Sequence, residues 1–520
     1  MSFNTEDIVQ EIHAEFESML TYVKGSKTAT ADQVERGIFR RLLDLGFKLM
    51  LLFFTIRAEE YPRAPIETEA GETLPYFDDK KRSYFSIFGK LPFWRPYFYK
   101  QGVGGKNPLD EELSLDSDCY SDLLREIAEY LGVDVTYDKV REMFARLLGQ
   151  KLSTNAIQNM VSKDAADIEA YYEQKPAPEP KDEGEILVIQ ADGKGVPMVR
   201  ETPATAKVRL GKGEKRTKKK EAIVTGVYTI ESHKRTPEEV VASFFHKDET
   251  SERKEIASER IKPQNKQLWA TLEGKDTALE RLAEQVERRE GSHIEHRVAL
   301  TDGCEALQTR VLSYCPDFTL ILDFIHGNEH LWDVANHLFD EQDPLRIPWV
   351  EEQTLKILSG ETEQVIADFR SLAQTPKRTK AQRKELEKAA NYFERNLPYM
   401  AYDYYLAQGW PIASGVIEGA CRHLVKDRFE LSGMRWTQAG AENLLHLRAV
   451  AENGDWDDYH EFRKQQRHAR LYNLPFPVQA RLEDQALDLP AQPSDKIIRF
   501  DVTAKRVPSH RGLDQQRQAA

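Results

Sequence analysis

The run EILVIQA at residues 185–191 restricts the fold more than any other feature of the sequence. Its aliphatic and β-branched side chains are typical of a strand that is buried on both faces of a sheet. Similar strands are predicted at 221–230 (EAIVTGVYTI), 297–300 and 318–324 (FTLILDF), and a helix is predicted at 305–314. Strands that alternate with helices predict an α/β core, in which helices cover a sheet.

The rest of the chain is mostly helical in pattern. Apolar residues at helical spacing predict helices at 5–24, 31–58, 120–131, 137–148, 153–162, 331–408 and 439–450, and the charged segment 235–290 is also expected to be helical. Because residues 50–54 are apolar all round, the second of these helices is expected to be buried. The aromatic segment 84–99 predicts a β-hairpin in which Gly89 and Pro92 mark turns.

A helix-turn-helix arrangement is predicted at the junction of two of these helices. Gly149 would end the first helix, and Ser153 would cap the second. One face of the second helix carries polar residues that suit contacts with bases or phosphates, namely Asn155, Gln158, Asn159 and Lys163. An ordinary pair of antiparallel helices would give the same pattern, so both interpretations stay open.

The composition excludes several classes of protein. The 520 residues include 73 Lys and Arg against 86 Asp and Glu, so the formal charge is −13, which argues against a protein that coats nucleic acid by bulk positive charge. The four cysteines are far apart and form no CxxC pair, which excludes a disulfide framework and the usual zinc spacings. The longest apolar stretch, 49–55, is far too short to cross a membrane, and the N-terminus shows no secretory pattern. We therefore expect a cytoplasmic protein without a membrane partner.

Three carboxylates are placed at the ends of predicted elements. Asp192 follows the strand at 185–191, Asp302 follows the strand at 297–300, and Glu418 lies in the first turns of the helix after Ser414. A carboxylate at a buried strand end needs a partner or a metal ion, because its charge is poorly solvated there. Three converging carboxylates would form an all-oxygen site for Mg²⁺. The alternatives are Asp-Gly turns at both aspartates and a helix-dipole role for Glu418.

Four stretches carry a resemblance to a known family. They are QADGKGVPM at 190–198, LILDFIHGNEHLW at 320–332, PIASGVIEGACRHLVKDRFELSGMRW at 411–436, and PLDEELSLDSDCYSDLL from Pro108. Over residues 84–450 the chain resembles the ISKra-type bacterial insertion-sequence transposases, which are DDE enzymes related to Mutator-like transposases. The resemblance implies an α/β RNase H-like core with a mixed sheet flanked by helices, a long all-helical insertion, and a mainly helical N-terminal DNA-binding region.

The resemblance leaves two candidates for the second catalytic aspartate, because Asp302 and Asp323 both end predicted strands. In the wider superfamily the second aspartate commonly precedes a helix, and the next strand carries Cys or Asp, two further residues, and then His. Asp323 and His326 fit that later pattern. Asp302 is therefore preferred as the catalytic residue, with Asp323 and His326 as accessory residues that support the site or position DNA.

The resemblance also implies the reaction: cleavage of DNA at the ends of the element, followed by attack of the freed 3′-OH on target DNA. Asp192, Asp302 and Glu418 would hold two Mg²⁺ (or Mn²⁺) ions for this phosphoryl transfer. The implied partners are double-stranded DNA, as terminal inverted repeats and as target, and further copies of the chain in a homo-oligomer at the bacterial nucleoid. Many relatives carry the cysteines of a zinc module near the aromatic segment, but residues 1–118 contain none, so no zinc is expected.

The candidate DNA contacts are concentrated in one basic segment, 207–220, which follows the strand that bears Asp192. Such a segment is usually a solvated loop, but its position favours phosphate contact. Arg422 and Lys426 would continue the face of Glu418, although Arg422 is equally suited to pair with Glu418. Trp436 would stack on an extruded base or belong to the core. The full set of candidates is Lys207, Arg209, Lys212, Lys215, Arg216, Lys218, Lys219, Lys220, Arg422, Lys426 and Trp436.

Three other functions fit parts of the sequence. The stretch HGNEH at 326–330 matches a zinc metalloprotease pattern that requires one continuous helix, and Gly327 and Asn328, so soon after a strand, argue against such a helix. A catalytically inactive or domesticated DNA-binding protein would keep the DNA contacts without cleavage. A nuclease of the same fold would cleave DNA without strand transfer.

The expected organisation has seven parts, of which the linker is recognised by its proline and charge content. They are an N-terminal helical region (1–75), the aromatic β segment with the helix-turn-helix-like DNA-binding region (76–173), the linker (174–184), the first part of the core (185–330), the helical insertion (331–410), the closing helix with Glu418 (411–450), and a C-terminal segment with a partly disordered tail (451–520).

Overall fold

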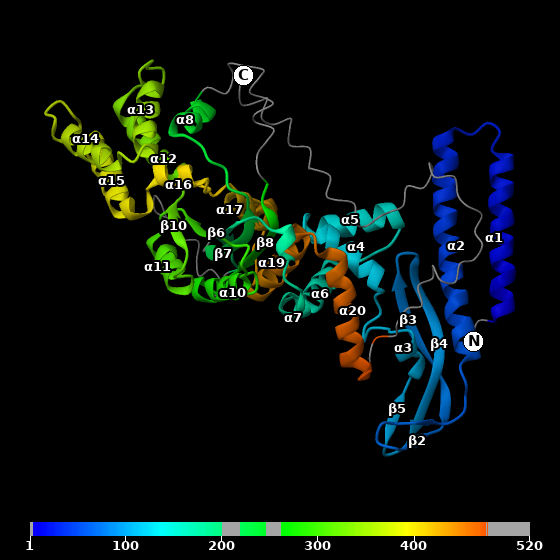
Figure 1. Ribbon diagram of the computed structural model, residues 1–520. Helices are drawn as coiled ribbons and strands as arrows, with labels where there is room; N and C mark the ends of the chain where they lie inside the picture. The colour runs from blue at the N-terminus through cyan, green and yellow to red at the C-terminus, as the bar shows by residue number, and fades with distance from the viewer. Residues whose placement is uncertain (1–3, 200–218, 246–261, 475, 477–520) are drawn as a thin grey trace, which may run out of the picture. The chain divides into compact units, whose positions relative to one another are not determined.

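The computed structural model of the chain describes residues 4–199, 219–245, 262–474 and 476. The chain divides into two compact units: Met1–Glu173 with Gly454–Ala520 form the first, and Gln174–Asn453 form the second. The chain therefore leaves the first unit once, where the linker is predicted to begin, and returns to it once. Figure 1 shows the elements of both units, coloured along the chain.

The second unit is built on a five-stranded mixed sheet. Its strands are β6 (Ile186–Pro197), β7 (Lys219–Ile230), β8 (Gln264–Thr271), β9 (His296–Thr301) and β10 (Thr319–Leu322), in the order β10-β9-β6-β7-β8. β7 runs antiparallel to β6 and β8, whereas β9 runs parallel to β6 and β10. The prediction of a mixed sheet within an α/β core is confirmed.

Both faces of this sheet are buried, because successive side chains of a strand point to opposite sides. Leu187 and Ile189 of β6 pack on one side with α10 (Lys275–Glu287) and α11 (Glu305–Tyr314). Ile186 and Val188 pack on the other side with α8 (Pro237–Phe245) and α12 (Phe324–Leu338). The sheet is thus the middle layer of three, which explains why its strands read as nearly continuous apolar runs.

The predicted helical segment after β10 is confirmed. It consists of α12, α13 (Arg346–Leu358), α14 (Thr362–Gln374), α15 (Lys380–Asn396) and α16 (Tyr402–Gln408). The fully buried side chains of Phe369, Phe393 and Tyr402 join these helices to the apolar residues of β6, β9 and β10 in one core. In the described part of the chain, no helix combines the length and the apolar character that a membrane span requires.

The end of the second unit covers the edge strand β8. Here the chain forms α17 (Gly415–Ala420), a π-helical segment (Cys421–Lys426), α18 (Asp427–Phe429) and α19 (Gln438–Asn453). The Asn453 side chain accepts a hydrogen bond from the Leu268 N–H at 2.8 Å and donates one to the Leu268 carbonyl at 3.0 Å. Glu442 accepts the N–H of Leu272 at 2.7 Å. These side chains form hydrogen bonds with backbone groups that would otherwise have no partner at the edge of the sheet.

The first unit combines helices with a small antiparallel sheet. Its elements are α1 (Thr5–Gly25), α2 (Ala31–Glu60), β1 (Ile66–Glu67), β2 (Thr73–Leu74), β3 (Tyr76–Ser86), β4 (Gly89–Lys100), β5 (Gly104–Lys106), α3 (Pro108–Glu112), α4 (Asp122–Gly132), α5 (Tyr137–Leu148), α6 (Thr154–Asp164), α7 (Ile168–Gln174) and α20 (Trp456–Tyr472). The hydroxyl of Tyr172, in α7, donates a hydrogen bond to Asp455 at 3.0 Å, so the two points at which the chain leaves and re-enters this unit are joined.

The helix pair α5–α6 has the predicted junction. Gly149 ends α5 with φ 68°, and the Ser153 hydroxyl accepts the N–H of Ala156 at 3.1 Å at the start of α6. On α6, Asn155 and Gln158 are exposed. The pair therefore presents a polar face to solvent, and its use as a DNA-reading helix stays a prediction.

Three local predictions were wrong. Pro92 is not in a turn but lies inside β4, opposite Ser83. At this point β4 has a neighbouring strand on one side only, and such a position tolerates a proline, which has no N–H to donate. The segment 235–290 contains β8 as well as helices, because the first half of β8 is exposed and polar and hides the strand pattern. In α2, Leu49 and Phe53 are exposed, so this helix is buried on one side only.

We expect Asn453→Ala to lower the free energy of unfolding by about 1–3 kcal/mol, because Leu268 would keep a buried N–H and carbonyl without their partner. Urea unfolding followed by tryptophan fluorescence measures this change. The control, Asn391→Ala at an exposed position of α15, should change stability by less than about 0.5 kcal/mol. Equal midpoints for Asn453→Ala and the wild type would show that the contact with β8 contributes nothing.

Candidate active site

Two of the three predicted catalytic residues lie at the same end of two neighbouring parallel strands. β6 and β9 pair from Ile186 opposite His296 to Gln190 opposite Leu300. The paired residues end there. Asp192 lies two residues further along β6, and Asp302 is the first residue after β9. Both therefore lie at the same edge of the sheet, and the Cys421 thiol, which hydrogen-bonds Asp192, also experiences the charge of Asp302. Both side chains are partly buried.

Asp192 does not end its strand, as the sequence suggested, but lies inside β6, opposite Val224 of β7. The alternative of an Asp-Gly turn is therefore wrong at this position, because Gly193 continues the strand. β6 extends beyond β9 since it pairs with β7 along its whole length. Asp302 ends β9 as predicted, and Gly303, with φ 83°, turns the chain toward α11.

Asp323 ends β10 and is almost fully buried, with 1% of its surface exposed. Its carboxylate accepts the N–H of Ile325 at 3.0 Å, the N–H of Ser414 at 3.3 Å, and the Ser414 hydroxyl. It also contacts Nδ1 of His326 at 2.8 Å. Both oxygens are thereby engaged in positioning α12 and the start of α17. Asp302 accepts the N–H of Cys304 at 2.9 Å. This difference favours Asp302 as the second catalytic aspartate, which stays a prediction.

Glu418 lies in α17 with an exposed side chain. The start of α17 is held by two buried groups: Asp323, which binds Ser414, and Gln190, whose side-chain oxygen accepts the N–H of Ile417 at 2.8 Å. One turn beyond Glu418, the thiol of Cys421 donates to Asp192 at 3.2 Å. Residues three apart share a helix face. Glu418 therefore lies within one turn of the residue that contacts Asp192.

The carboxylates shift the pKa values of neighbouring groups. Burial raises the pKa of the Cys421 thiol, and the charges of Asp192 and Asp302 raise it further. The hydrogen bond with Asp323 raises the pKa of His326 to about 9, against the opposing effect of burial and with a contribution from Asp302. Burial raises the pKa of Tyr392, again with a contribution from Asp302. A negative field of this kind attracts cations.

The donor atoms at this strand edge are those that Mg²⁺ prefers. Asp192 and Asp302 supply carboxylates from adjacent strands, and Glu418 approaches from α17. Among the described residues, however, no three His, Cys, Asp or Glu side chains converge closely enough to hold an ion. The side chain of Glu418 is exposed.

The prediction that HGNEH at 326–330 does not lie in one continuous helix was wrong. Residues 326–330 lie in one continuous helix, α12, because Asp323 caps that helix immediately after β10. Gly327 does not break it. His326 contacts Asp323, whereas the ring of His330 packs on Tyr392 with 3.9 Å between centroids, and burial lowers the His330 pKa. Within the described ranges no third metal-binding side chain joins the two histidines.

The candidate DNA contacts fall into two groups. Lys207, Arg209, Lys212, Lys215, Arg216 and Lys218 lie outside the described residues. Lys219 and Lys220 begin β7, where Lys219 is exposed and forms an ion pair with Glu430. Arg422 and Lys426 are exposed on the π-helical segment, and Arg422 lies 3.7 Å from Asp427. The alternative that Arg422 pairs with Glu418 is therefore wrong.

Trp436 is a core residue. It is 7% exposed, and its indole N–H donates to the Phe429 carbonyl at 3.3 Å. The Phe429 ring packs against it with 4.9 Å between centroids, and its backbone pairs with Pro197 and Val199 around the end of β6. A tryptophan covered in this way is not placed to stack on an extruded base, so that prediction was wrong.

Sequence reasoning missed the residues that hold the site together. Gln190 is a buried amide inside an apolar strand. A single amide in an otherwise apolar run was the sequence signal that could have identified it. The sequence marks Ser414 only as the residue before the helix of Glu418, yet its side chain binds Asp323. Cys421 lies three residues after Glu418, which was a weaker signal in the sequence.

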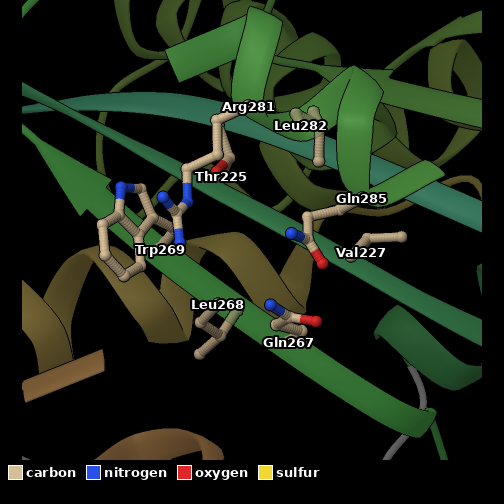
Figure 2. Close-up of a pocket in the computed structure, with 8 residues that line it drawn as sticks. All are labelled: Thr225, Val227, Gln267, Leu268, Trp269, Arg281, Leu282 and Gln285. Carbon is tan, nitrogen blue, oxygen red and sulfur yellow. The ribbon is translucent and has the colours of Figure 1, made fainter. Parts of the chain in front are cut away.

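A shallow hollow lies elsewhere on the sheet, between α10 and the strands β7 and β8. Figure 2 shows its lining residues, which are Thr225, Val227, Gln267, Leu268, Trp269, Arg281, Leu282 and Gln285. The Arg281 guanidinium lies 3.4 Å from the centre of the Trp269 ring, a cation–π contact. The volume of about 10 Å³ is enough for one water molecule. The carboxylates therefore remain the candidate active site.

We expect His326 to titrate near pH 9 and Asp323→Asn to bring its pKa back toward 6.5, because the hydrogen bond with Asp323 is the largest cause of the shift. The pKa is raised in the folded state, so its stabilising effect is complete below pH 6.5 and is lost as the pH rises through 9. Histidine-selective NMR titration, with His326→Gln to assign the signal, measures it. A wild-type value near 6.5 would contradict the contact.

Comparison of the chain with the models of known protein families finds no match, and comparison with curated proteins finds none either. Its function is therefore inferred from its motifs, its strand arrangement and the geometry of the carboxylates.

Proposed function

We propose that the chain is a DDE transposase of the ISKra type, which cuts DNA at the ends of an insertion sequence and joins those ends to target DNA. One observation carries the proposal. Asp192, in β6, and Asp302, directly after β9 and 110 residues later (302 − 192), lie at the same edge of two adjacent parallel strands, and Cys421, which directly follows the helix of Glu418, hydrogen-bonds Asp192. The strand order β8-β7-β6-β9-β10, with three antiparallel strands followed by two parallel ones, supports an RNase H-like core.

In this function Asp192 and Asp302 would hold divalent cations at the strand edge, with Glu418 as a further ligand. Bound Mg²⁺ or Mn²⁺ would supply an activated nucleophile and charge compensation for the leaving oxygen. Asp192 and Asp302 are carried by paired strands, so they need little reorganisation to bind. Asp323 holds Ser414 and thereby fixes the start of the helix that presents Glu418.

The DNA backbone would be held by positive side chains close to this edge. Lys219, Arg422 and Lys426 are exposed, and His326, with its pKa of about 9, is positive at neutral pH. Since the whole chain carries a charge of −13, its affinity for DNA must come from such local groups. We place this activity on double-stranded DNA in the bacterial cytoplasm, in a homo-oligomer.

Two alternatives remain distinguishable by experiment. A catalytically inactive DNA-binding protein would bind terminal repeats without cutting them, and a nuclease would cut them without joining the ends to a target. The continuous helix α12 meets one requirement of the zinc protease pattern. The positive charge of His326 disfavours metal binding there, because a zinc ligand must be neutral.

We expect Asp192→Asn, Asp302→Asn and Glu418→Gln each to lower the rate of Mg²⁺-dependent strand cleavage at least about a hundredfold, because each removes a ligand of the ion that stabilises the transition state. The assay uses duplex oligonucleotides with the inverted repeats that flank the gene, and gel shifts should show unchanged binding. Asp317→Asn, at an exposed position ahead of β10, is the matched control. An Asp192→Asn protein that still cleaves would overturn the assignment.

The basic segment is tested separately through the salt dependence of binding. Replacing Lys215, Lys218 and Lys220 with Gln should weaken binding to DNA of any sequence and reduce the slope of log affinity against log salt by up to about 0.9 per lost phosphate contact. Titrations by fluorescence anisotropy measure both quantities. The control replaces three exposed lysines of the helical insertion, Lys377, Lys380 and Lys384. Equal slopes for the two variants would show that the basic segment does not contact the DNA.

A further inference from the structure

The helices α1 and α2 form an antiparallel hairpin with an exposed apolar face. The start of α1 contacts the end of α2 through Thr5 and Glu59, and the end of α1 contacts the start of α2 through Tyr22 and Gln33. Seven large apolar side chains of this hairpin are 36–51% exposed. They are Phe16, Leu20 and Val23 of α1 and Phe39, Leu42, Leu49 and Phe53 of α2, and together they are called the hairpin face.

These side chains lie on the same side of the hairpin. Glu15 of α1 pairs with Arg41 and Lys48 of α2 at 3.2 and 3.7 Å, which marks one flank of the contact between the helices as polar. Phe16 and Leu42 each follow a member of these pairs and so lie about 100° further round their helices. Because the helices are antiparallel, moving one residue along either helix turns toward the same side of the hairpin. Phe16 and Leu42 therefore lie on one side of the hairpin, away from the ion pairs.

The hairpin face is large for a surface exposed to water. Seven side chains that are about half exposed leave on the order of 80 Å² each, or roughly 550 Å² in total. This area is near the upper end of the range for the largest apolar patch on a typical monomer, about 300–600 Å², and such patches are often functional. Two such faces in contact would bury about 1,100 Å², near the lower bound for specific protein–protein interfaces.

The charges beside the hairpin face suit a second copy of the same chain. α1 contains five acidic residues and one lysine, so its net charge is −4 (1 − 5). α2 carries two exposed arginines within three residues of Phe39: Arg36, which also pairs with Asp32 of the same helix, and Arg40. A two-fold axis along the helices would set each α1 over the other copy's α2, so that the acidic helix meets these arginines. Such a pair is a four-helix bundle, a common arrangement for two hairpins.

We propose that the hairpin face is a self-association surface through which two copies of the chain form a symmetric dimer. It specifies a contact for the homo-oligomer of the proposed function, but it is argued from the surface of α1 and α2 and is tested without DNA or cleavage.

The test measures the molar mass of the full chain by light scattering during size-exclusion chromatography, over about a hundredfold range of concentration. We expect the wild type to be a dimer and Leu42→Glu to raise the dissociation constant at least about a hundredfold, because it places a charge in the centre of the contact. The control, Leu345→Glu, makes the same change at an exposed leucine of the second unit and should leave the dimer intact.

Two outcomes would overturn the proposal: a wild-type chain that stays monomeric at every concentration, or a Leu42→Glu chain that is folded by circular dichroism and still dimeric. If Leu42→Glu fails to fold, hydrogen exchange of the wild type decides. Amides of α1 and α2 should be protected more strongly at high protein concentration than at low concentration. Unchanged protection would exclude this face, whatever other partner covers it.

Discussion

The parallel pairing of β6 with β9 is the constraint on which the candidate site depends. Backbone hydrogen bonds fix the register of the two strands to a single residue, because a slip of one position would turn every buried side chain to the wrong face. Gln190 opposite Leu300 therefore brings Asp192, in β6, and Asp302, directly after β9, to the same edge of the sheet. The antiparallel partner β7 supports β6 past the end of β9, and so keeps Asp192 on rigid backbone rather than in a loop.

A second constraint is the need to satisfy buried polar groups. A carboxylate as buried as Asp323 is costly without hydrogen bonds, and the groups that satisfy it belong to α12 and to the start of α17. Gln190 meets the same requirement through the N–H of Ile417. Two buried polar side chains in different strands thus fix the helix of Glu418 to the sheet, at the edge where the aspartates lie.

The sequence predicted the parts of the fold whose patterns are local and strong. The apolar runs gave β6, β7, β9 and β10, and Gly149 and Ser153 marked a helix junction correctly. β8 was missed because half of it faces solvent and reads as polar. The helix at His326 was missed because Gly327 has low helix propensity, whereas the cap from Asp323 and the packing of the helix outweigh that preference. Ser414 and Gln190 act through contacts across 91 and 227 residues, which no local pattern reveals.

The hydrogen bond between Tyr172 and Asp455 also bears on how such a chain can evolve. It ties together the two ends of the first unit between which the whole second unit is inserted. A segment whose entry and exit are adjacent behaves like an oversized surface loop, and lengthening a loop costs little conformational entropy. A gene rearrangement that exchanged or shortened the second unit would therefore leave the core of the first unit intact.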